Sequence, residues 1–147
     1  QKEWRSTIYT GTLSIDYITG SKIECSLVPI YTPASVHDEN AYTNTFVLRN
    51  TGSLNATVNI FLEISLNEFS SGALKFALYD SNEKIINTGN ISDSQILMLS
   101  EDILLNAGEE NEYTLQIWLD ETNKYQNKEM KKKFLASINF DSVQEKD

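Results

Sequence analysis

The sequence predicts an all-β protein, folded as a jelly-roll-like antiparallel β-sandwich in a single domain. Short stretches that alternate apolar with polar residues recur along the chain, and turn signals separate them at roughly ten-residue intervals. A sustained helical period is almost absent. The 147 residues, of which 40% are hydrophobic, suffice for one hydrophobic core, and neither a long linker nor a change of composition divides them.

The first two predicted strands cover residues 12–18 and 22–31. Residues 12–18 alternate apolar with polar side chains and end at a turn centred on Gly20, which favours a hairpin-like connection. In residues 22–31, the side chains of Ile23 and Cys25 fall on one face of a strand. Residues 30–39 hold a proline and a polar cluster, so we expect a loop that crosses between the sheets.

The next strands are predicted at residues 41–50, 56–66, 73–79 and 84–88. Residues 41–50 carry regularly spaced apolar side chains and stop at a turn. Residues 56–66 give the clearest alternation in the chain, which is typical of a strand with one buried face. Residues 73–79 and 84–88 flank an acidic turn of residues 80–83, and this arrangement indicates a hairpin.

The last third of the chain contains one ambiguous element. Residues 94–105 fit either a helical stripe or two short strands broken at residues 100–102, and we expect strands because a turn follows directly. Residues 112–119 are expected to form a strand and residues 120–130 a polar loop. Residues 133–143 alternate again as a last strand, and residues 144–147 are expected to be a tail.

The composition argues against several classes of function. The formal net charge is −9, with 21 acidic residues against 12 Lys and Arg residues, so the basic face that nucleic acid binding requires is missing. Cys25 is the only cysteine and His37 the only histidine. One cysteine cannot form an intramolecular disulfide, and one histidine cannot supply the ligands of a zinc peptidase. Phosphate-binding loops and nucleophile motifs are absent, so we nominate no catalytic residue and expect no cofactor.

Hard oxygen ligands gather in the predicted loop of residues 120–130. Asp120, Glu121 and Asn123 offer carboxylate and amide oxygens of the kind that calcium prefers. The loop lacks the spaced acids and the glycine of an EF-hand, so these three residues are a weak calcium candidate.

The amino-terminal segment, residues 1–10, carries large apolar side chains without a local partner. Trp4, Ile8 and Tyr9 all precede the first turn. An extended segment of this kind can complete a sheet in its own domain or in a neighbour's through main-chain hydrogen bonds. An ordinary edge strand or a disordered leader explains the segment equally well. We therefore divide the chain into an amino-terminal donor or edge strand (1–10), a β-sandwich domain (11–143) and a tail (144–147).

Four stretches resemble, in order, the TasA and camelysin family of secreted Gram-positive surface and biofilm-matrix proteins. They are residues 10–15, 42–52, 106–109 with 113–120, and 132–144. The most suggestive is the strand that runs into Asn50, Gly52 and Ser53, which is similar to the family's pattern of strand, Asn-x-Gly-Ser and strand. The resemblance implies a jelly-roll-like sandwich and export by a signal peptide that has been removed. For TasA-like members it also implies fibres in which the amino-terminal strand of each subunit inserts into the next.

From this resemblance we expect a secreted, extracellular or cell-surface protein that is a structural fibre subunit and not an enzyme. Trp4, Ile8 and Tyr9 would take the donor-strand role, and the partner would be a further copy of the chain in a head-to-tail homopolymer. The cell surface and other matrix components are further candidate partners. Two alternatives stay open: a monomeric cell-surface adhesion module that binds through loops 30–39 and 120–130, and, less favoured, a camelysin-like metallopeptidase.

Overall fold

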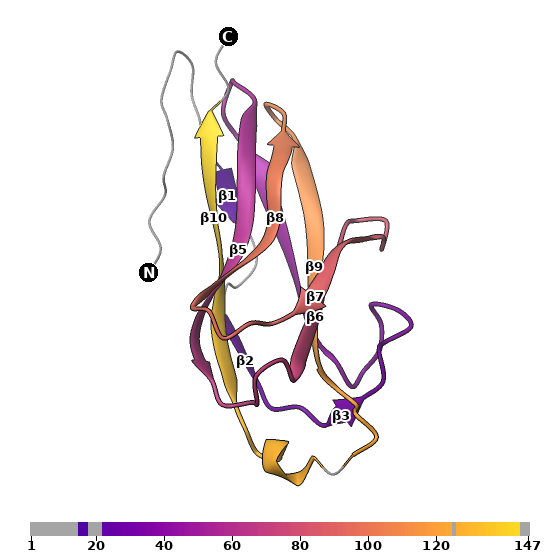
Figure 1. The fold of residues 1–147 in the computed structure, drawn as a ribbon. Coiled ribbons are helices and arrows are strands. Elements are labelled where there is room, and N and C mark those ends of the chain that lie inside the picture. The colour runs from indigo at the N-terminus through magenta and orange to yellow at the C-terminus, as the bar shows by residue number, and fades with distance from the viewer. Residues whose placement is uncertain (1–14, 18–21, 125, 145–147) are drawn as a thin grey trace.

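The computed structural model describes residues 15–17, 22–124 and 126–144, which form strands, turns and one short 3-10 helix at Asn127–Glu129 (Figure 1). The strands are β1 (Ile15–Tyr17), β2 (Lys22–Cys25), β3 (Pro29–Ile30), β4 (Tyr42–Asn50), β5 (Ala56–Asn67), β6 (Leu74–Tyr79), β7 (Ile85–Asn90), β8 (Ile96–Leu105), β9 (Glu110–Asp120) and β10 (Phe134–Gln144). Over the described ranges, no helix is long and apolar enough to cross a membrane. The prediction of an all-β protein is confirmed.

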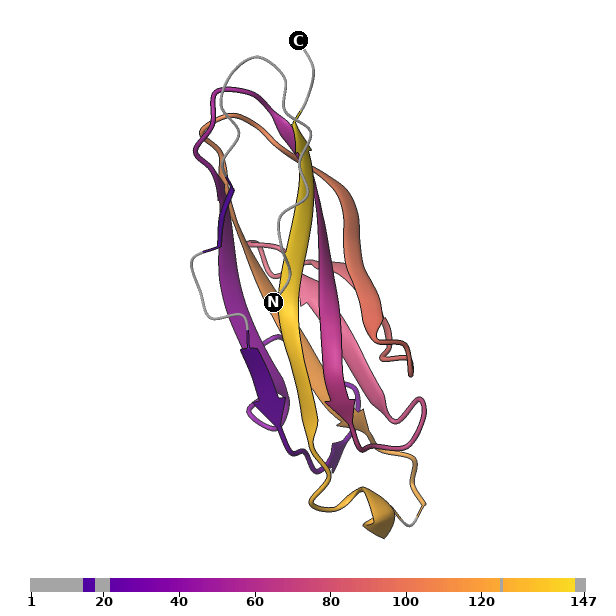
Figure 2. The ribbon, with the colours of Figure 1, turned by 90° about the vertical axis from the view of Figure 1, so that its left-hand side faces the viewer.

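The strands pair in the order of a jelly roll. β2 pairs with β10, β4 with β9, β5 with β8 and β6 with β7, all antiparallel, so the chain follows one long hairpin that has been rolled up. Two further antiparallel pairs, β5 with β10 and β6 with β9, complete two sheets. In the described part of the chain, sheet A has the order β1-β4-β9-β6-β7, with β3 parallel to β9, and sheet B has the order β2-β10-β5-β8. Figure 2 shows the two layers packed face to face.

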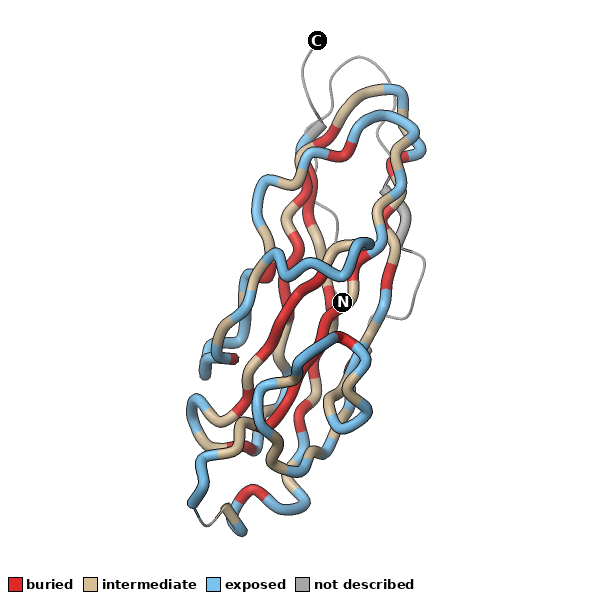
Figure 3. Tube along the Cα trace, turned by 90° about the vertical axis from the view of Figure 1, so that its right-hand side faces the viewer, coloured by how far each residue is buried: buried red, intermediate tan, exposed pale blue. Residues whose placement is uncertain are grey.

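The main hydrophobic core lies between the two sheets. Alternate residues of β5, namely Val58, Ile60 and Leu62, are fully buried, and so are Leu115 and Ile117 of β9 in the opposite sheet. The alternation in residues 56–66 therefore predicted the core face of β5 correctly. Figure 3 shows buried residues along the middle of the strands and exposed residues at the turns. Each fully buried aliphatic side chain contributes about 1.5 to 3 kcal/mol relative to exposure, so this layer is the main source of stability.

A second, smaller apolar cluster lies on the outer face of sheet A. It consists of Val36, Ala77, Tyr79 and Trp118. Val36 belongs to the loop of residues 31–41, which packs onto the sheet at this point. The buried Gln116 holds the loop there, because it accepts a hydrogen bond from the Tyr79 hydroxyl (3.0 Å) and donates one to the main-chain oxygen of Ser35 (2.9 Å). The middle of sheet A is consequently buried on both faces.

Two elements differ from the sequence-based expectation. Residues 22–31 form two strands in different sheets, and the second, β3, begins at Pro29, which has no N–H to continue a ladder. Residues 96–105 form the single strand β8, although the polar residues 100–102 indicated a break. The pairing of β8 with β5 is irregular there, and Asp102 adopts a left-handed φ of 56° while donating its backbone N–H to Asn59 Oδ1 (2.8 Å). The polar interruption is thus an irregularity within a strand.

The last strand runs slightly further than expected. β10 ends at Gln144, whereas the sequence placed that residue in the tail.

Candidate functional site: a half-paired sheet edge

One side of the sandwich is closed by two short strands that belong to different sheets. β1 pairs with residues 48–50 of β4, and β2 pairs with residues 134–137 of β10. Among the described residues, no strand lies on that side beside residues 138–144 of β10, or beside residues 42–47 of β4. Figure 2 views this side, with β2 in indigo and β10 in yellow. We call residues 138–144 the half-edge of β10.

The core-facing row of the half-edge is mostly apolar. It consists of Ile138, Phe140 and Ser142, whose partners on β5 are Leu62, Ile60 and Val58. All three partners are fully buried, which fixes the direction of the row toward the core. A strand placed beside the half-edge would set each second side chain against this row.

The outward-facing row of the half-edge holds the polar Asn139 and Asp141 and the exposed Val143. Asn139 donates a hydrogen bond to Glu63 Oε1 (3.1 Å), and Asn59 donates one to Asp141 Oδ1 (3.2 Å), both across the β5–β10 pair. The pairing with β5 is regular along the whole half-edge. The side of residues 138–144 away from β5 therefore has the regular strand geometry that suits pairing with a strand of alternating apolar and polar residues.

The edges on the other side of the sandwich are protected. β8, the long edge strand of sheet B, carries Glu101 and Asp102 and the irregular pairing described above, and both features discourage a further strand. Asn87 of β7, the edge strand of sheet A, donates a hydrogen bond to the main-chain oxygen of Leu99 in β8 (2.7 Å). This bond ties the two edges together.

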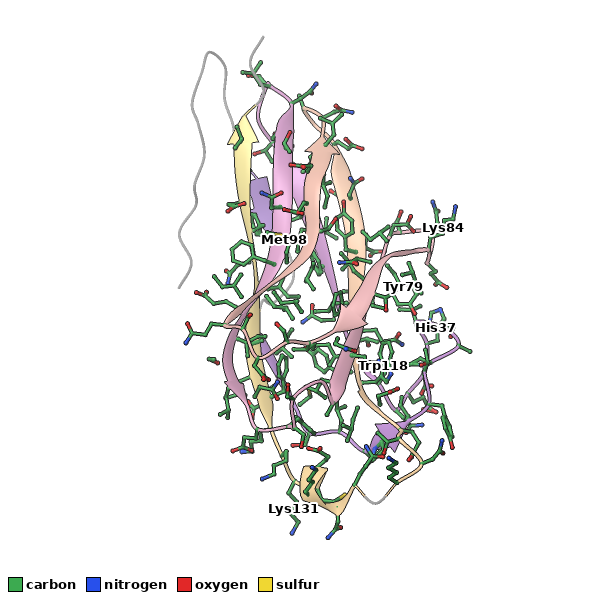
Figure 4. All side chains as sticks on the ribbon, viewed as in Figure 1. His37, Tyr79, Lys84, Met98, Trp118 and Lys131 are labelled. Atoms are coloured by element: carbon green, nitrogen blue, oxygen red, sulfur yellow. The ribbon has the colours of Figure 1, made fainter. Side chains whose placement is uncertain are left out.

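A polar cleft of about 300 Å³ lies on the outer face of sheet A. It is formed by the loop of residues 31–41, the β6–β7 turn and the neighbouring strands, and its lining includes the carboxylates of Asp80, Glu83 and Glu112. His37 Nε2 lies 2.9 Å from Glu83 Oε2 and links the loop to the turn (Figure 4). Such a lining suits a ligand that donates hydrogen bonds or carries positive charge.

Cys25 and His37 lie in different parts of the sandwich, Cys25 on a strand of sheet B and His37 in the loop between β3 and β4. Cys25 lies on β2 opposite Phe134 and packs against the main core. His37 is exposed on the outer face of sheet A beside Glu83. Burial raises the pKa of the Cys25 thiol to about 11, which favours the protonated thiol at neutral pH.

The oxygens of the calcium candidate make hydrogen bonds and an ion pair within the protein. Glu121 Oε2 accepts a hydrogen bond from the backbone N–H of Asn123 (2.9 Å), and Asn123 Oδ1 accepts one from the Tyr31 hydroxyl. Asp120 Oδ2 lies 3.9 Å from Lys75 Nζ. Within the described ranges, no group of three or more His, Cys, Asp or Glu side chains is placed to hold a metal ion. The calcium site stays a prediction.

The residues with the predicted donor role, Trp4, Ile8 and Tyr9, lie outside the described residues, so the donor strand also stays a prediction. The half-edge and the cleft are features that sequence reasoning missed. Alternation in residues 133–143 gives the buried face of β10, but no local signal reveals that β2 pairs only with residues 134–137 of that strand.

Comparisons with known proteins add nothing about function. No family model matches the chain, and no curated protein matches it. Among solved structures, a chain in the structure of the infectious bursal disease virus Gx strain matches with a TM-score of 0.39 and 8% sequence identity. The match covers 89% of this chain but only 31% of the viral chain. A likeness at this level carries no argument about relationship or activity.

Proposed function

We propose that the protein is the structural subunit of an extracellular bacterial fibre, in which residues 1–10 of one copy pair with the half-edge of β10 in the next. The observation that carries this proposal is the half-edge itself. Among the described strands, β2 pairs only with residues 134–137 of β10, the pairing of residues 138–144 with β5 is regular, and the core-facing row of these residues is mostly apolar. Main-chain donors and acceptors exposed along such a stretch are a template for a further strand.

Residues 1–10 have the length and the pattern that the half-edge needs. An extended strand advances by about 3.3 Å per residue, so the segment is longer than residues 138–144 require. In an extended segment, Trp4 and Ile8 would stand on one face, and Arg5, Thr7 and Tyr9 would stand on the other. Trp4 and Ile8 would face the apolar inner row of β10, and Tyr9 would lie on the outer side, where Val143 is exposed.

Donation from each copy to the next gives a head-to-tail contact. The donor and acceptor surfaces differ, so the contact is heterologous and generates an open filament unless the rotation closes a ring. Secretion and a role in the extracellular matrix are part of this proposal, and the resemblance to the TasA and camelysin family supports them.

Deletion of residues 1–10 tests the proposal. The full chain is expected to form fibres that are visible by electron microscopy, and the deletion variant is expected to stay monomeric by light scattering because the donor is missing. A synthetic peptide of residues 1–10 should inhibit assembly of the full chain by occupying the half-edge, whereas a scrambled peptide of the same composition should not. Fibres of normal length from the deletion variant would contradict the proposal.

A monomeric cell-surface binding module is the second candidate function, and the polar cleft favours it. The cleft lies beside the loop of residues 31–41, within the region where a ligand-binding loop was expected. This candidate requires that the full chain stays monomeric at all concentrations. It also requires that a cell-wall polysaccharide or a cationic peptide binds the full chain and that Glu112→Ala abolishes binding. Concentration-dependent fibres from the full chain would favour the first candidate.

A further inference from the structure

Basic side chains gather at one end of the sandwich. The loop of residues 121–133 joins β9 to β10 and contains the 3-10 helix, and Figure 1 shows it at one end of the long axis. Figure 4 labels Lys131 at this end. Against two glutamates, the loop holds five of the chain's 12 Lys and Arg residues, namely Lys124, Lys128, Lys131, Lys132 and Lys133. We call residues 121–133 the basic end.

Acidic side chains gather toward the opposite end. Residues 101–112 run from the second half of β8 through the β8–β9 turn into β9, and Figure 1 shows this turn at the other end of the long axis. They contain no Lys or Arg and five acidic residues, namely Glu101, Asp102, Glu109, Glu110 and Glu112. Among the described residues, only Glu110 of these five has an ion-pair partner, which is Arg49 at 2.9 Å. We call residues 101–112 the acidic end.

Internal hydrogen bonds fix the basic end to the sandwich. Glu129 is 4% exposed, and its Oε1 atom accepts a hydrogen bond from the backbone N–H of Ser70 (3.0 Å). Glu68 Oε1 accepts another from the backbone N–H of Lys133 (2.9 Å). Within the described ranges, none of the five lysine ammonium groups has an ion-pair partner. The basic end is thus an anchored surface whose positive charge is not neutralised locally.

The two ends cannot neutralise each other within one copy. The 11 residues of β10 run between them, and at roughly 3.3 Å per residue they span about 35 Å. Attraction between exposed charges is largely screened beyond about 8 Å at physiological ionic strength. The net charge of −9 makes copies of the chain repel one another, and this repulsion is weakest where the basic end of one copy meets the acidic end of another.

We propose that the basic end of each copy docks against the acidic end of the next copy. This inference rests on the proposed function and names a second contact surface for the same head-to-tail assembly. Opposite charges set the orientation of the contact, because two like ends repel each other. Head-to-head contacts are therefore disfavoured, as growth of an open filament requires.

Charge reversal at each end of the full chain tests the contact. The basic-end variant replaces three exposed lysines, by Lys124→Glu, Lys128→Glu and Lys131→Glu. The acidic-end variant replaces three exposed glutamates, by Glu101→Lys, Glu110→Lys and Glu112→Lys. Each variant alone is expected to raise the critical concentration for fibre formation, measured by sedimentation at low salt, by about tenfold or more. The wild-type critical concentration should rise as NaCl increases from about 50 mM to about 500 mM.

Mixing the two variants separates charge from misfolding. The basic-end variant has two acidic ends, and the acidic-end variant has two basic ends. In an equal mixture they can alternate along a fibre, so assembly should return close to the wild-type critical concentration. A variant that had lost its fold could not be rescued in this way.

A matched control separates the contact from net charge. Glu39→Lys, Glu83→Lys and Asp93→Lys together make the same change of net charge as the acidic-end variant, at exposed positions outside both ends. Glu83 also loses an exposed pair, with His37, as Glu110 does with Arg49. This control should not raise the critical concentration, because it only lowers the general repulsion between copies.

The possible results separate the end contact from strand donation. If both variants assemble like the wild type while deletion of residues 1–10 abolishes fibres, the end contact is wrong and the proposed function stands. If the variants are impaired and rescued by mixing while the deletion variant still forms fibres, strand donation is wrong and the end contact stands. A basic-end variant that assembles normally but no longer binds phosphatidylglycerol vesicles would assign the lysines to an anionic surface and overturn the end contact. A wild-type chain that forms no fibres would overturn both.

Discussion

Asn50 provides the sharpest stability prediction, because its buried amide joins three parts of the sandwich. It is 0% exposed. Its Nδ2 group donates hydrogen bonds to the main-chain oxygens of Leu54 (2.9 Å) and Leu105 (3.0 Å). Its Oδ1 atom accepts one from the backbone N–H of Gly52 (2.9 Å). The side chain therefore holds the β4–β5 turn and fixes it to the end of β8.

Replacing Asn50 with alanine removes all three side-chain hydrogen bonds. A typical hydrogen bond contributes about 0.5 to 1.5 kcal/mol net, and a buried group left unpaired costs about 1 to 3 kcal/mol. Only the bond to Leu105 is fully buried, so water can replace part of the loss at Gly52 and Leu54. We therefore expect Asn50→Ala to lower the free energy of unfolding by about 3 kcal/mol, out of a total of about 5 to 15 kcal/mol for a domain.

Asn50→Asp gives a second, qualitatively different readout. A carboxylate keeps the acceptor for Gly52 but brings negative charge against the carbonyl oxygens of Leu54 and Leu105. At neutral pH we expect it to be at least as destabilising as Asn50→Ala. Protonation would restore one donor, so its deficit relative to wild type should shrink as the pH falls.

Chemical denaturation of the monomer, followed by tryptophan fluorescence, measures both variants. Asn90→Ala is the matched control, because Asn90 is exposed and its Oδ1 atom accepts a hydrogen bond only from the Lys75 ammonium (3.0 Å) among the contacts described. The control should lie within about 0.5 kcal/mol of wild type. A loss below about 1 kcal/mol for Asn50→Ala would refute the role assigned to this amide.

Two further predictions concern buried groups. At pH 8 the Cys25 thiol should react with iodoacetamide roughly one hundred times more slowly in the folded than in the unfolded chain, because burial raises its pKa from 9.0 to about 11. Because the thiol of the unfolded chain ionises at lower pH than that of the folded chain, the free energy of unfolding should fall as the pH rises from 9 to 11. Cys25→Ala should make this fall less steep. The same dependence on pH in the wild type and in Cys25→Ala would refute the prediction. Gln116→Leu should cost about 2 kcal/mol in the same denaturation assay, because it leaves the Tyr79 hydroxyl and the Ser35 carbonyl without their bonds; an unchanged midpoint would refute it.

The sequence predicts the strands well because most of them carry one buried face. The alternation of residues 56–66 depends on the sandwich core itself, and residues 80–83 form the turn between β6 and β7 as expected. The alternation of apolar and polar residues does not predict which side chains are buried where a strand is covered on both faces. Trp118 stands in the outward row of β9 and is nevertheless 3% exposed, because the loop of residues 31–41 packs over its cluster. That burial depends on a tertiary contact that no local pattern records.

The candidate site could not be predicted for a related reason. Periodicity gives the face of a strand but not its neighbours, so the sequence cannot reveal that β1 and β2 cover different halves of opposite sheets. Asn50 illustrates the intermediate case. The sequence marked it as part of a turn motif, but its 0% exposure and its contact with Leu105 are visible only in the fold.

The two sides of the sandwich also differ in a way that bears on the geometry of assembly. On one side, the Asn87 bond to Leu99 and the acidic, irregular β8 oppose strand addition. On the other side, β2 stops at Cys25, opposite Phe134, and no described strand beyond β2 pairs with residues 138–144 of β10 on that side. A subunit with one acceptor and one donor forms unbranched chains, whereas acceptors on both sides would give branched aggregates. Substitutions that make the pairing of β8 regular, such as Asp102→Val, would therefore open a second edge to strand addition. We expect such variants to form bundles in place of single fibres, and we expect no gain in the stability of each fibre.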